Sequence, residues 1–185
     1  MSNSGDDPLI AGLTAGDERA FAALYDRYGT RLYRTALGIV GRREDAEDAV
    51  QEVLISLVRS RKALAKVNDL TAYLFSALRR AAARCAQREK REPAAAQIVE
   101  DIEDKTTQGE TNNFRADHLE QALRQLPEEQ REVILLKIDG QMTFAQIAQV
   151  LEISLNTAAS RYRYALEKLR EILSGAGNTP KCRQQ

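Results

Sequence analysis

The chain has 185 residues, of which 43% are apolar and 29% charged, and its 27 basic side chains balance 27 acidic ones. This composition is typical of a folded, soluble protein and excludes disordered and collagen-like classes. A net charge of zero gives no overall sign of the basic surface that nucleic-acid binding requires.

Cysteine and histidine are too sparse for some kinds of site. Cys85 and Cys182 lie far apart and His118 is the single histidine, so we expect neither a disulfide framework nor a Cys/His metal site. The start, MSNSGDDPLIAGL, has no basic segment followed by a long apolar run, and no stretch approaches the about 20 apolar residues of a membrane span. We therefore expect a cytoplasmic protein without a membrane segment.

The neutral total conceals an uneven distribution of charge along the chain. Residues 1–58 carry a net charge of −4, residues 59–92 carry +7, residues 93–118 carry −4 and residues 119–185 carry +1. Segregation of this kind indicates surfaces that meet different partners.

Apolar residues recur at helical spacing in three segments of the N-terminal part. Asp17 is expected to cap the first helix, and Gly41 marks its end. The second helix includes the sequence DAEDAVQEVLISLV at residues 45–58. Asp69 is expected to cap the third, which continues into the basic residues 84–91.

An acidic segment over residues 92–113 predicts a boundary between two domains. It shows no sustained apolar period, and a structureless run of this length is improbable inside one compact domain. We therefore place domains at residues 8–91 and 114–174, joined by a flexible linker.

The C-terminal part is also helical in pattern. A first helix is expected up to Leu126, Pro127 suits the first turn of the next, and Gly140 fits a stop at the end of that helix. Thr143 and Gln146 match a capping box at the start of a third helix. Neither part shows a period-2 strand, so the predicted fold class is all-α, with two small helical domains.

Residues 143–169 have the proportions of a helix-turn-helix, with Ser154 as the expected cap of its second helix. Many such turns carry Gly where Glu152 stands, so the turn need not be tight. One apolar stripe of the second helix should be buried: Ala158, Tyr162, Ala165, Leu169 and Ile172. Another stripe carries hydroxyl and guanidinium groups that can reach bases and phosphates, although an ordinary solvated face has the same spacing. The candidate DNA-binding residues of this unit are Thr143, Thr157, Ser160, Arg161, Arg163, Tyr164 and Lys168.

In the N-terminal part, Asp45, Asp48 and Glu52 lie near Gln51 on a predicted helix. The group fits a solvated helix face and a docking face for a basic partner equally well. Acid–base catalysis or a divalent cation comes third, because no matching histidine, nucleophile or Gly-rich phosphate loop accompanies the carboxylates. We predict neither an enzyme nor a cofactor.

A basic helix runs from Tyr73 to Arg91. Its cationic groups can follow a phosphate backbone, and aromatic rings can stack on unpaired bases. For Tyr73 and Phe75 we favour, at least in part, a place in the core, whereas for the arginines a net charge of +7 without a compensating acidic face favours nucleic acid. The candidate DNA-binding residues here are Asn68, Tyr73, Arg79, Arg80, Arg84 and Arg88.

These segments resemble a known family. AFAALYDRYGTRLYRTALGIVG at residues 20–41 with DAEDAVQEVLISLV resembles the core-polymerase-binding region of bacterial sigma factors. LPEEQREVILLKIDGQMTFAQIAQVLEISLNTAASRYRYALEKLR at residues 126–170 resembles their C-terminal promoter-reading domain. Two such blocks in this order, without an extra domain between them, resemble the extracytoplasmic-function (ECF) group of the sigma-70 family.

The resemblance implies a transcription initiation factor that recruits core RNA polymerase to promoter DNA. Residues 8–91 then correspond to region 2 and residues 114–174 to region 4. The residues Asp45, Asp48, Gln51 and Glu52 correspond to the surface that docks on the clamp of the largest polymerase subunit, and region 4 meets the flap region. The basic helix, with the loop from Leu64 to Asn68, corresponds to the part that melts and holds the −10 element. The second helix of the helix-turn-helix corresponds to the reader of the −35 element.

The resemblance also implies regulation, because family members are often held by an anti-sigma factor. The sequence departs from the family pattern at five positions, so we infer no promoter sequence: Tyr73, Arg80, Arg84, Glu152 and Ala159. The alternative interpretation is a stand-alone helix-turn-helix transcription regulator that binds duplex DNA without polymerase.

Overall fold

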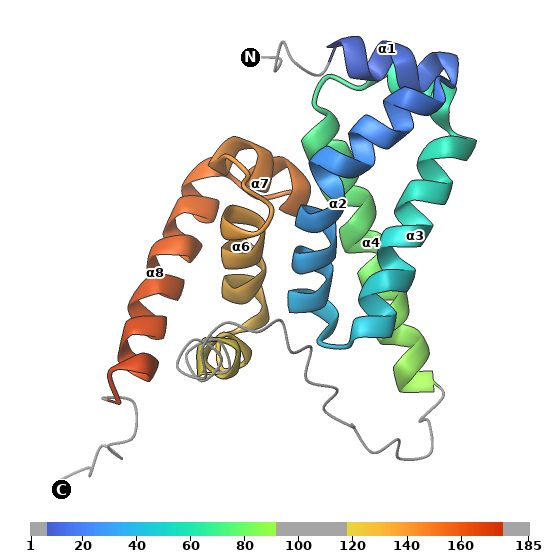
Figure 1. Ribbon diagram of the computed structural model, residues 1–185. Helices are drawn as coiled ribbons and strands as arrows, with labels where there is room; N and C mark the ends of the chain where they lie inside the picture. The colour runs from blue at the N-terminus through green and yellow to red at the C-terminus, as the bar shows by residue number, and fades with distance from the viewer. Residues whose placement is uncertain (1–6, 92–117, 176–185) are drawn as a thin grey trace, which may run out of the picture.

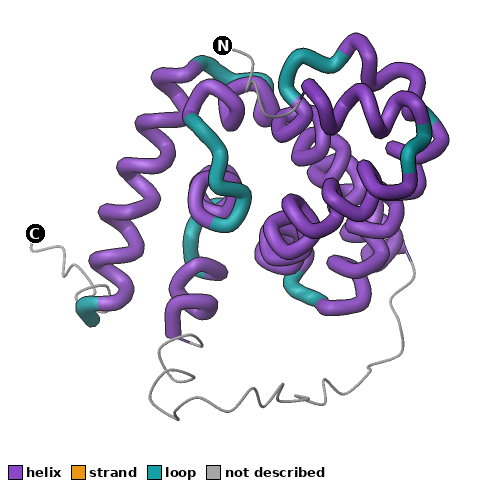
Figure 2. Tube along the Cα trace, turned by 45° about the horizontal axis from the view of Figure 1, so that its top comes forward, coloured by secondary structure: helices purple, strands orange, loops and turns teal. Residues whose placement is uncertain are grey.

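The computed structural model describes residues 7–91 and 118–175, except for the side chains of residues 86 and 88–91. All regular elements in these residues are helices, so the predicted all-α class is confirmed (Figure 2). The N-terminal domain comprises α1 (Asp7–Ala15), α2 (Glu18–Val40), α3 (Arg43–Arg59), the 3₁₀ helix η1 (Arg61–Lys66) and α4 (Leu70–Arg91). The C-terminal domain comprises a short helix over residues 118–124, α6 (Glu128–Ile138), α7 (Phe144–Leu151) and α8 (Leu155–Leu173). Within the described residues, no helix is both long and apolar enough to cross a membrane. The predicted linker at residues 92–113 lies outside them.

In the N-terminal domain, α2, α3 and α4 pack side by side, and α1 lies across one end of this bundle (Figure 1). The predicted helix boundaries are confirmed. The Asp17 carboxylate accepts a hydrogen bond from the Arg19 amide at 3.0 Å, and Asp69 accepts one from the Ala72 amide at 2.8 Å. Gly41 ends α2 in the left-handed conformation, with φ of 78°, which glycine adopts without steric cost.

The core of this bundle is mainly apolar, and the buried polar residues of its helices are Thr35 and Thr71. Tyr28 is fully buried, and its hydroxyl lies 3.1 Å from the hydroxyl of Thr71, so neither buried group is left without a hydrogen bond. Phe75 is also fully buried, so this ring belongs to the core and is not available to stack on a base.

Two details of the C-terminal domain differ from the sequence-based expectation. Pro127 precedes α6 as its N-cap, one position before the predicted first turn. Gly140 follows α6 as expected, but the left-handed residue there is Gln141, with φ of 49°. Glycine is needed at position 140 for space, because a Cβ atom would lie 2.5 Å from the carbonyl oxygen of Leu136.

The helix-turn-helix is built on two side-chain caps. Thr143 and Gln146 form the predicted capping box at the start of α7, and Ser154 accepts a hydrogen bond from the Thr157 amide at 3.0 Å at the start of α8. Glu152 between them has φ of 55°, in the left-handed region. The expectation that this turn need not be tight is therefore wrong, because Glu152 adopts the conformation that glycine would supply.

The two domains pack directly against each other. α6 lies beside α2, and α7 lies against α4 (Figure 1). Leu136, Met142 and Ile147 of the C-terminal domain are almost fully buried, and they belong to the same apolar cluster as the core of the N-terminal domain. A second, smaller cluster joins the C-terminal helices among themselves through Ala122, Leu126, Ile134, Ala165 and Leu169.

Candidate functional site

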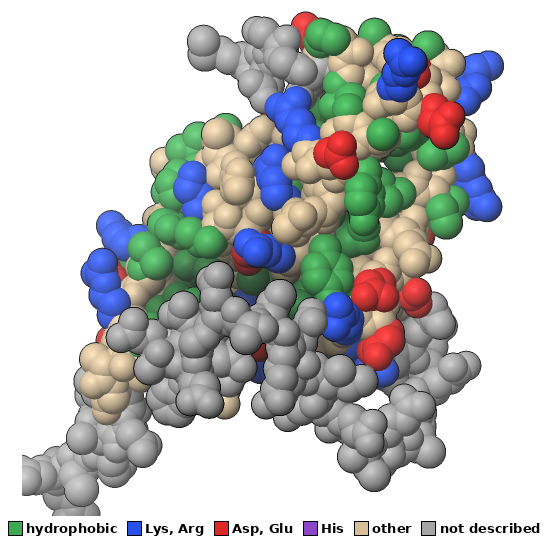
Figure 3. Space-filling model, in the orientation of Figure 1, with side chains coloured by type: hydrophobic (Ala, Val, Ile, Leu, Met, Phe, Trp, Pro, Cys, Tyr) green, Lys and Arg blue, Asp and Glu red, His purple; other side chains and the backbone are tan. Residues whose placement is uncertain are grey.

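The acidic residues of α3 lie in different environments. Asp45 is half-buried and pairs with Arg42, with 3.7 Å between Nε and Oδ2. Asp48 is exposed, whereas Glu52 forms an ion pair with Arg84 of α4. Figure 3 shows acidic side chains gathered on the lower part of the N-terminal domain, near the start of α3. The structure thus keeps the carboxylates on α3 but gives two of them basic neighbours.

Gln51 lies in a groove between α2 and α3. The groove has a volume of about 570 Å³, and its lining combines aromatic, aliphatic and acidic residues: Tyr25, Asp26, Gly29, Thr30, Tyr33, Glu47, Val50, Gln51 and Leu54. Tyr25 of this lining is 59% exposed, and α3 itself carries two further exposed apolar side chains, Ile55 at 50% and Val58 at 48% of full exposure. Such an apolar surface with a polar rim is typical of protein-binding sites.

Sequence reasoning did not select these apolar residues. Their signal is nevertheless present, because Ile55 and Val58 fall outside the buried stripe of α3 that contains Val50, Val53 and Leu57. A helix that carries apolar residues outside its buried stripe exposes a second apolar surface, which a binding partner can cover.

The basic face of α4 is partly neutralised by other helices. Arg79, Arg80 and Arg84 are exposed, but the Nε of Arg79 lies 2.6 Å from Glu132 of α6, and Arg84 pairs with Glu52. The expectation that this basic segment lacks compensating acidic groups is therefore wrong, because the acids come from α3 and α6. The side chain of Arg88 lies outside the described residues.

Two further candidates lie near the start of α4. Tyr73 is half-buried, and its hydroxyl is 3.4 Å from the hydroxyl of Ser60. Asn68 is exposed and lines a groove of about 420 Å³ between α1 and the segment that follows η1. Asn68 therefore lies in the loop that precedes the basic helix, and Tyr73 lies near the start of that helix.

The polar stripe of α8 is accessible along most of its length. Arg163 and Tyr164 are exposed, with the guanidinium carbon of Arg163 5.0 Å from the centre of the Tyr164 ring. Thr157 and Ser160 are half-buried near the start of the helix. Arg161 pairs with Glu129 of α6 at 2.5 Å.

The opposite stripe of α8 holds this helix in the domain. Ala158, Ala165 and Leu169 are buried as predicted, whereas Tyr162 and Ile172 are only partly buried. The Phe144 and Tyr162 rings meet edge to face, with 5.5 Å between their centres. α8 therefore has the buried and exposed faces expected of a helix that presents side chains to a partner.

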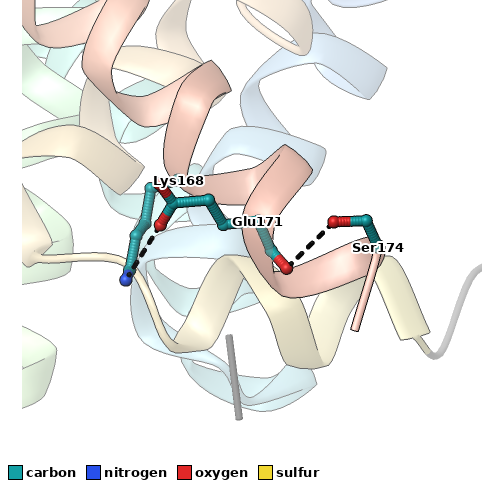
Figure 4. A network of polar contacts seen from close by, with 3 residues as sticks. All are labelled: Lys168, Glu171 and Ser174. Carbon is teal, nitrogen blue, oxygen red and sulfur yellow. Dashed lines mark hydrogen bonds and ion pairs between the residues drawn. The ribbon is translucent and has the colours of Figure 1, made fainter. Parts of the chain in front are cut away.

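Lys168 lies nearer the C-terminal end of α8. Its Nζ is 3.4 Å from Oε2 of Glu171, whose carbonyl oxygen accepts a hydrogen bond from the Ser174 hydroxyl (Figure 4). Thr143, the remaining candidate, is exposed, but its hydroxyl already takes part in the capping box of α7. Over residues 7–91 and 118–175, no group of three or more His, Cys, Asp or Glu residues is arranged to hold a metal ion.

Both halves of the chain match regions of one protein family. Residues 24–92 match "Sigma-70 region 2", and residues 117–169 match "Sigma-70, region 4". Because both regions are present, the alternative of a stand-alone regulator is not favoured.

Relatives match along nearly the whole chain. The chain is 30% identical over 169 residues to the ECF RNA polymerase sigma factor SigM of Mycobacterium tuberculosis, covering 91% of this chain and 84% of the relative. It is 29% identical over 175 residues to the ECF RNA polymerase sigma factor SigK of Mycobacterium bovis, covering 90% of this chain and 92% of the relative.

Two solved structures share the fold. One is CnrH in complex with the cytosolic domain of CnrY, with a TM-score of 0.69 at 22% identity, covering 92% of this chain and 97% of the other. The second is the sigma factor RpoE of Bartonella quintana in complex with the anti-sigma factor NepR, with a TM-score of 0.62 at 22% identity, covering 77% and 89%. Taken with the two matched regions and the relatives, these findings show that the chain belongs to the sigma-70 family of RNA polymerase sigma factors, in its ECF group.

Proposed function

We propose that this sigma factor recruits core RNA polymerase to promoters through three separate surfaces, one on each of α3, α4 and α8. The observation that carries the proposal is the groove between α2 and α3, where Gln51 and Glu47 stand beside exposed apolar side chains. α3 lies on the side of the molecule away from α6, α7 and α8, which leaves this surface accessible (Figure 1). It is assigned to the polymerase clamp, together with Asp45, Asp48 and Glu52.

The basic face of α4 is assigned to the melted −10 element. Arg79, Arg80 and Arg84 supply exposed guanidinium groups that bind phosphate, while Asn68 and Tyr73 lie at the loop where unpaired bases would be held. In this assignment the acids Glu132 and Glu52 act as internal counterions that DNA phosphates must replace.

The α8 surface is assigned to duplex DNA at the −35 element. Arg161, Arg163 and Lys168 are close enough along one helix to follow a groove and its phosphates, and short hydroxyl side chains stand near the start of the same helix. The same domain is assigned to the polymerase flap region. In this proposal residues 8–91 act as region 2 and residues 114–174 act as region 4, as the sequence suggested.

An anti-sigma factor is a further proposed partner. Two proteins of the same fold were solved as complexes, one with the cytosolic domain of CnrY and the other with the anti-sigma factor NepR. The exposed apolar groove of α3 is a surface that such an inhibitor would need to cover in order to prevent polymerase binding.

The direct test mixes the purified protein with core polymerase and a library of promoter fragments. Formation of a complex and of transcripts with defined start sites supports the proposal. Duplex binding without core enzyme, combined with no complex and no transcript, contradicts it.

The position of the polymerase surface needs a separate test. Tyr25→Ala removes an exposed ring from the groove, and Leu173→Ala removes a comparably exposed apolar side chain at the far end of α8. We expect Tyr25→Ala to weaken core binding by about 10-fold, as the loss of a central aromatic contact does. Leu173→Ala should leave it unchanged, and equal effects of the two variants contradict the assignment.

A further inference from the structure

The first turn of α8 presents an apolar side chain to solvent. α8 begins at Leu155, and this side chain is 52% exposed although it is apolar. Asn156 beside it is also exposed. α8 lies on the side of the C-terminal domain away from α2, α3 and α4, which leaves room for a large partner (Figure 1). Single exposed leucines are common on protein surfaces, and what distinguishes Leu155 is its place at the start of the second helix of a helix-turn-helix.

The hydroxyl groups at the start of α8 already have partners. The Ser154 hydroxyl accepts a hydrogen bond from the Thr157 amide at 3.0 Å, and the hydroxyl oxygens of these two residues lie 2.8 Å apart. Both hydroxyl groups thus serve the cap of the helix. Ala158 is fully buried. The first turn therefore offers a partner chiefly the side chains of Leu155 and Asn156.

Leu155 belongs to a stripe of α8 that is separate from its buried stripe. Ala159 and Arg163 follow Leu155 at spacings of four residues, so the three side chains share one side of the helix. Ala159 is half-buried and Arg163 is exposed. Asn156 and Ser160 lie beside this stripe, each one residue further along. The stripe therefore has two apolar side chains near the helix start and a guanidinium about two turns later.

The charges near the start of α8 favour a polyanion as the partner. The first turn of α8 contains no acidic residue, whereas the first turns of α2, α3 and α6 each contain at least one. The partial positive charge at this helix end is therefore not neutralised within the turn. Glu152 lies outside the helix, in the turn before its cap, and the acids of α8 itself, Glu167 and Glu171, lie in its C-terminal half. A DNA duplex offers phosphates to this end of the helix, which an apolar protein surface does not.

The major groove of DNA contains an apolar group that this stripe can read. Thymine carries its C5 methyl group there, and apolar side chains contact that group. The first residues of a recognition helix reach the base edges, and Leu155 is the first residue of α8. Asn156 beside it has an amide of the kind that binds the edge of adenine. Leu155 is therefore placed to meet a thymine methyl group.

We propose that Leu155 is a specificity-determining residue of the α8 surface and contacts the C5 methyl group of one thymine in the −35 element. This rests on the proposed function, in which α8 enters the major groove at that element. It adds a base that the hydroxyl and guanidinium groups of α8 do not read. Because the contact is apolar, it sets the preference for one base without changing the number of phosphates that the protein neutralises.

The test begins with the duplex that the protein prefers. Full-length protein bound to core polymerase selects its upstream element from a pool of DNA duplexes with a randomised −35 segment. Each thymine of the selected element is then replaced singly by deoxyuridine, which pairs with adenine in the same way and lacks only the C5 methyl group. Affinities are measured for the wild type, for Leu155→Ala and for Leu173→Ala, whose side chain is equally exposed at 52% but lies at the other end of α8.

We expect one of these replacements to weaken wild-type binding about 4-fold, which is the value of burying one methyl group. Leu173→Ala should show the same loss at the same thymine. Leu155→Ala should bind the thymine and uracil duplexes equally. Its affinity should depend on salt concentration as steeply as that of the wild type, because no phosphate contact is removed.

A wild type that is insensitive to every replacement overturns the proposal, and this measurement does not depend on the folding of any variant. A Leu155→Ala variant that remains as sensitive as the wild type also overturns it. If Leu155→Ala weakens core polymerase binding and keeps the sensitivity to the methyl group, Leu155 faces a protein and the proposal is wrong. If no duplex is selected at all, the proposed function fails as well. Selection of a duplex without sensitivity to the methyl group refutes the role of Leu155 alone.

Discussion

Glu52 of α3 and Arg84 of α4 form an ion pair, which joins the helix proposed to dock on polymerase to the helix proposed to hold the −10 element. Both side chains are about half-exposed, at 48% and 53%, so the pair contributes at most about 1 kcal/mol to folding. Its greater consequence is functional, because each residue reduces the charge that the other offers to a partner.

This pairing predicts that substitutions of Asp48 and Glu52 affect core polymerase binding to different extents. Asp48→Arg should weaken core polymerase binding by about 10-fold, because it reverses an exposed charge at the proposed docking surface. Glu52→Gln should weaken it only about 2-fold, because Arg84 already neutralises part of that charge. Binding of core enzyme is measured by fluorescence anisotropy, with circular dichroism to check that the fold is intact. Unchanged affinity of Asp48→Arg refutes the docking assignment.

A second prediction concerns Arg161, which pairs with Glu129 in the absence of DNA. Glu129→Gln should strengthen binding to a −35 duplex about 2- to 5-fold, because Arg161 no longer has to leave a carboxylate in order to reach DNA. Arg161→Ala should weaken binding by about 10-fold or more, as expected for a guanidinium that contacts a base. Both are measured at one fixed salt concentration. If Glu129→Gln binds like the wild type, the pair does not compete with DNA.

The left-handed Glu152 makes the helix-turn-helix turn a site for stabilisation. Glu152→Gly should raise the free energy of unfolding by about 0.5–1 kcal/mol, since the left-handed conformation costs a non-glycine residue about 1–2 kcal/mol and the more flexible unfolded chain offsets part of the gain. Glu152→Val should lower stability, because a β-branched residue tolerates this conformation least. Urea unfolding followed by circular dichroism measures both changes. If Glu152→Val is more stable than Glu152→Gly, the backbone at position 152 is not strained.

Asp139, the C-cap of α6, makes stability depend on pH. Burial raises the pKa of its carboxyl above the ordinary value of 3.8, and the positive charge of Arg34 only partly opposes this. The folded state therefore holds the proton more tightly than the unfolded state, and the stability due to this group is lost as pH rises through the folded pKa.

Asp139→Asn should accordingly make the protein more stable than the wild type at about pH 7, with a difference that disappears at and below about pH 4. Chemical unfolding at a series of pH values provides the measurement. A variant that is less stable at neutral pH would show that the charged carboxylate stabilises the fold.

Local sequence was sufficient for the boundaries of most helices. The caps at Asp17, Asp69 and Ser154, and the capping box at Thr143, were all predictable because each bonds to an amide only two or three residues away. α1 and η1 were not predicted: α1 is short, and its one fully buried residue is Leu13. α1 and η1 pack against each other, and the periodicity of the sequence does not reveal tertiary contacts that stabilise such short helices.

The sequence was sufficient to predict the candidate binding residues, but not the side chains with which they form ion pairs. Asp48, Arg163 and Tyr164 are exposed, as a binding role requires. The pairs of Arg84 with Glu52 and of Arg79 with Glu132 join residues 32 and 53 positions apart, and no local pattern specifies such distances. The exposed apolar groove on α3 became recognisable only when α2 was packed beside it.

The sequence by itself thus determined the all-α class, the helix caps, the helix-turn-helix and the family, because periodicity, capping and motifs are properties of short segments. Tertiary structure alone decided which charges neutralise one another and that the two domains meet. Asp69 shows the difference within one side chain. One oxygen caps a helix three residues away, as the sequence predicts, and the other binds Gln146, 77 residues away, because folding brings α4 and α7 together.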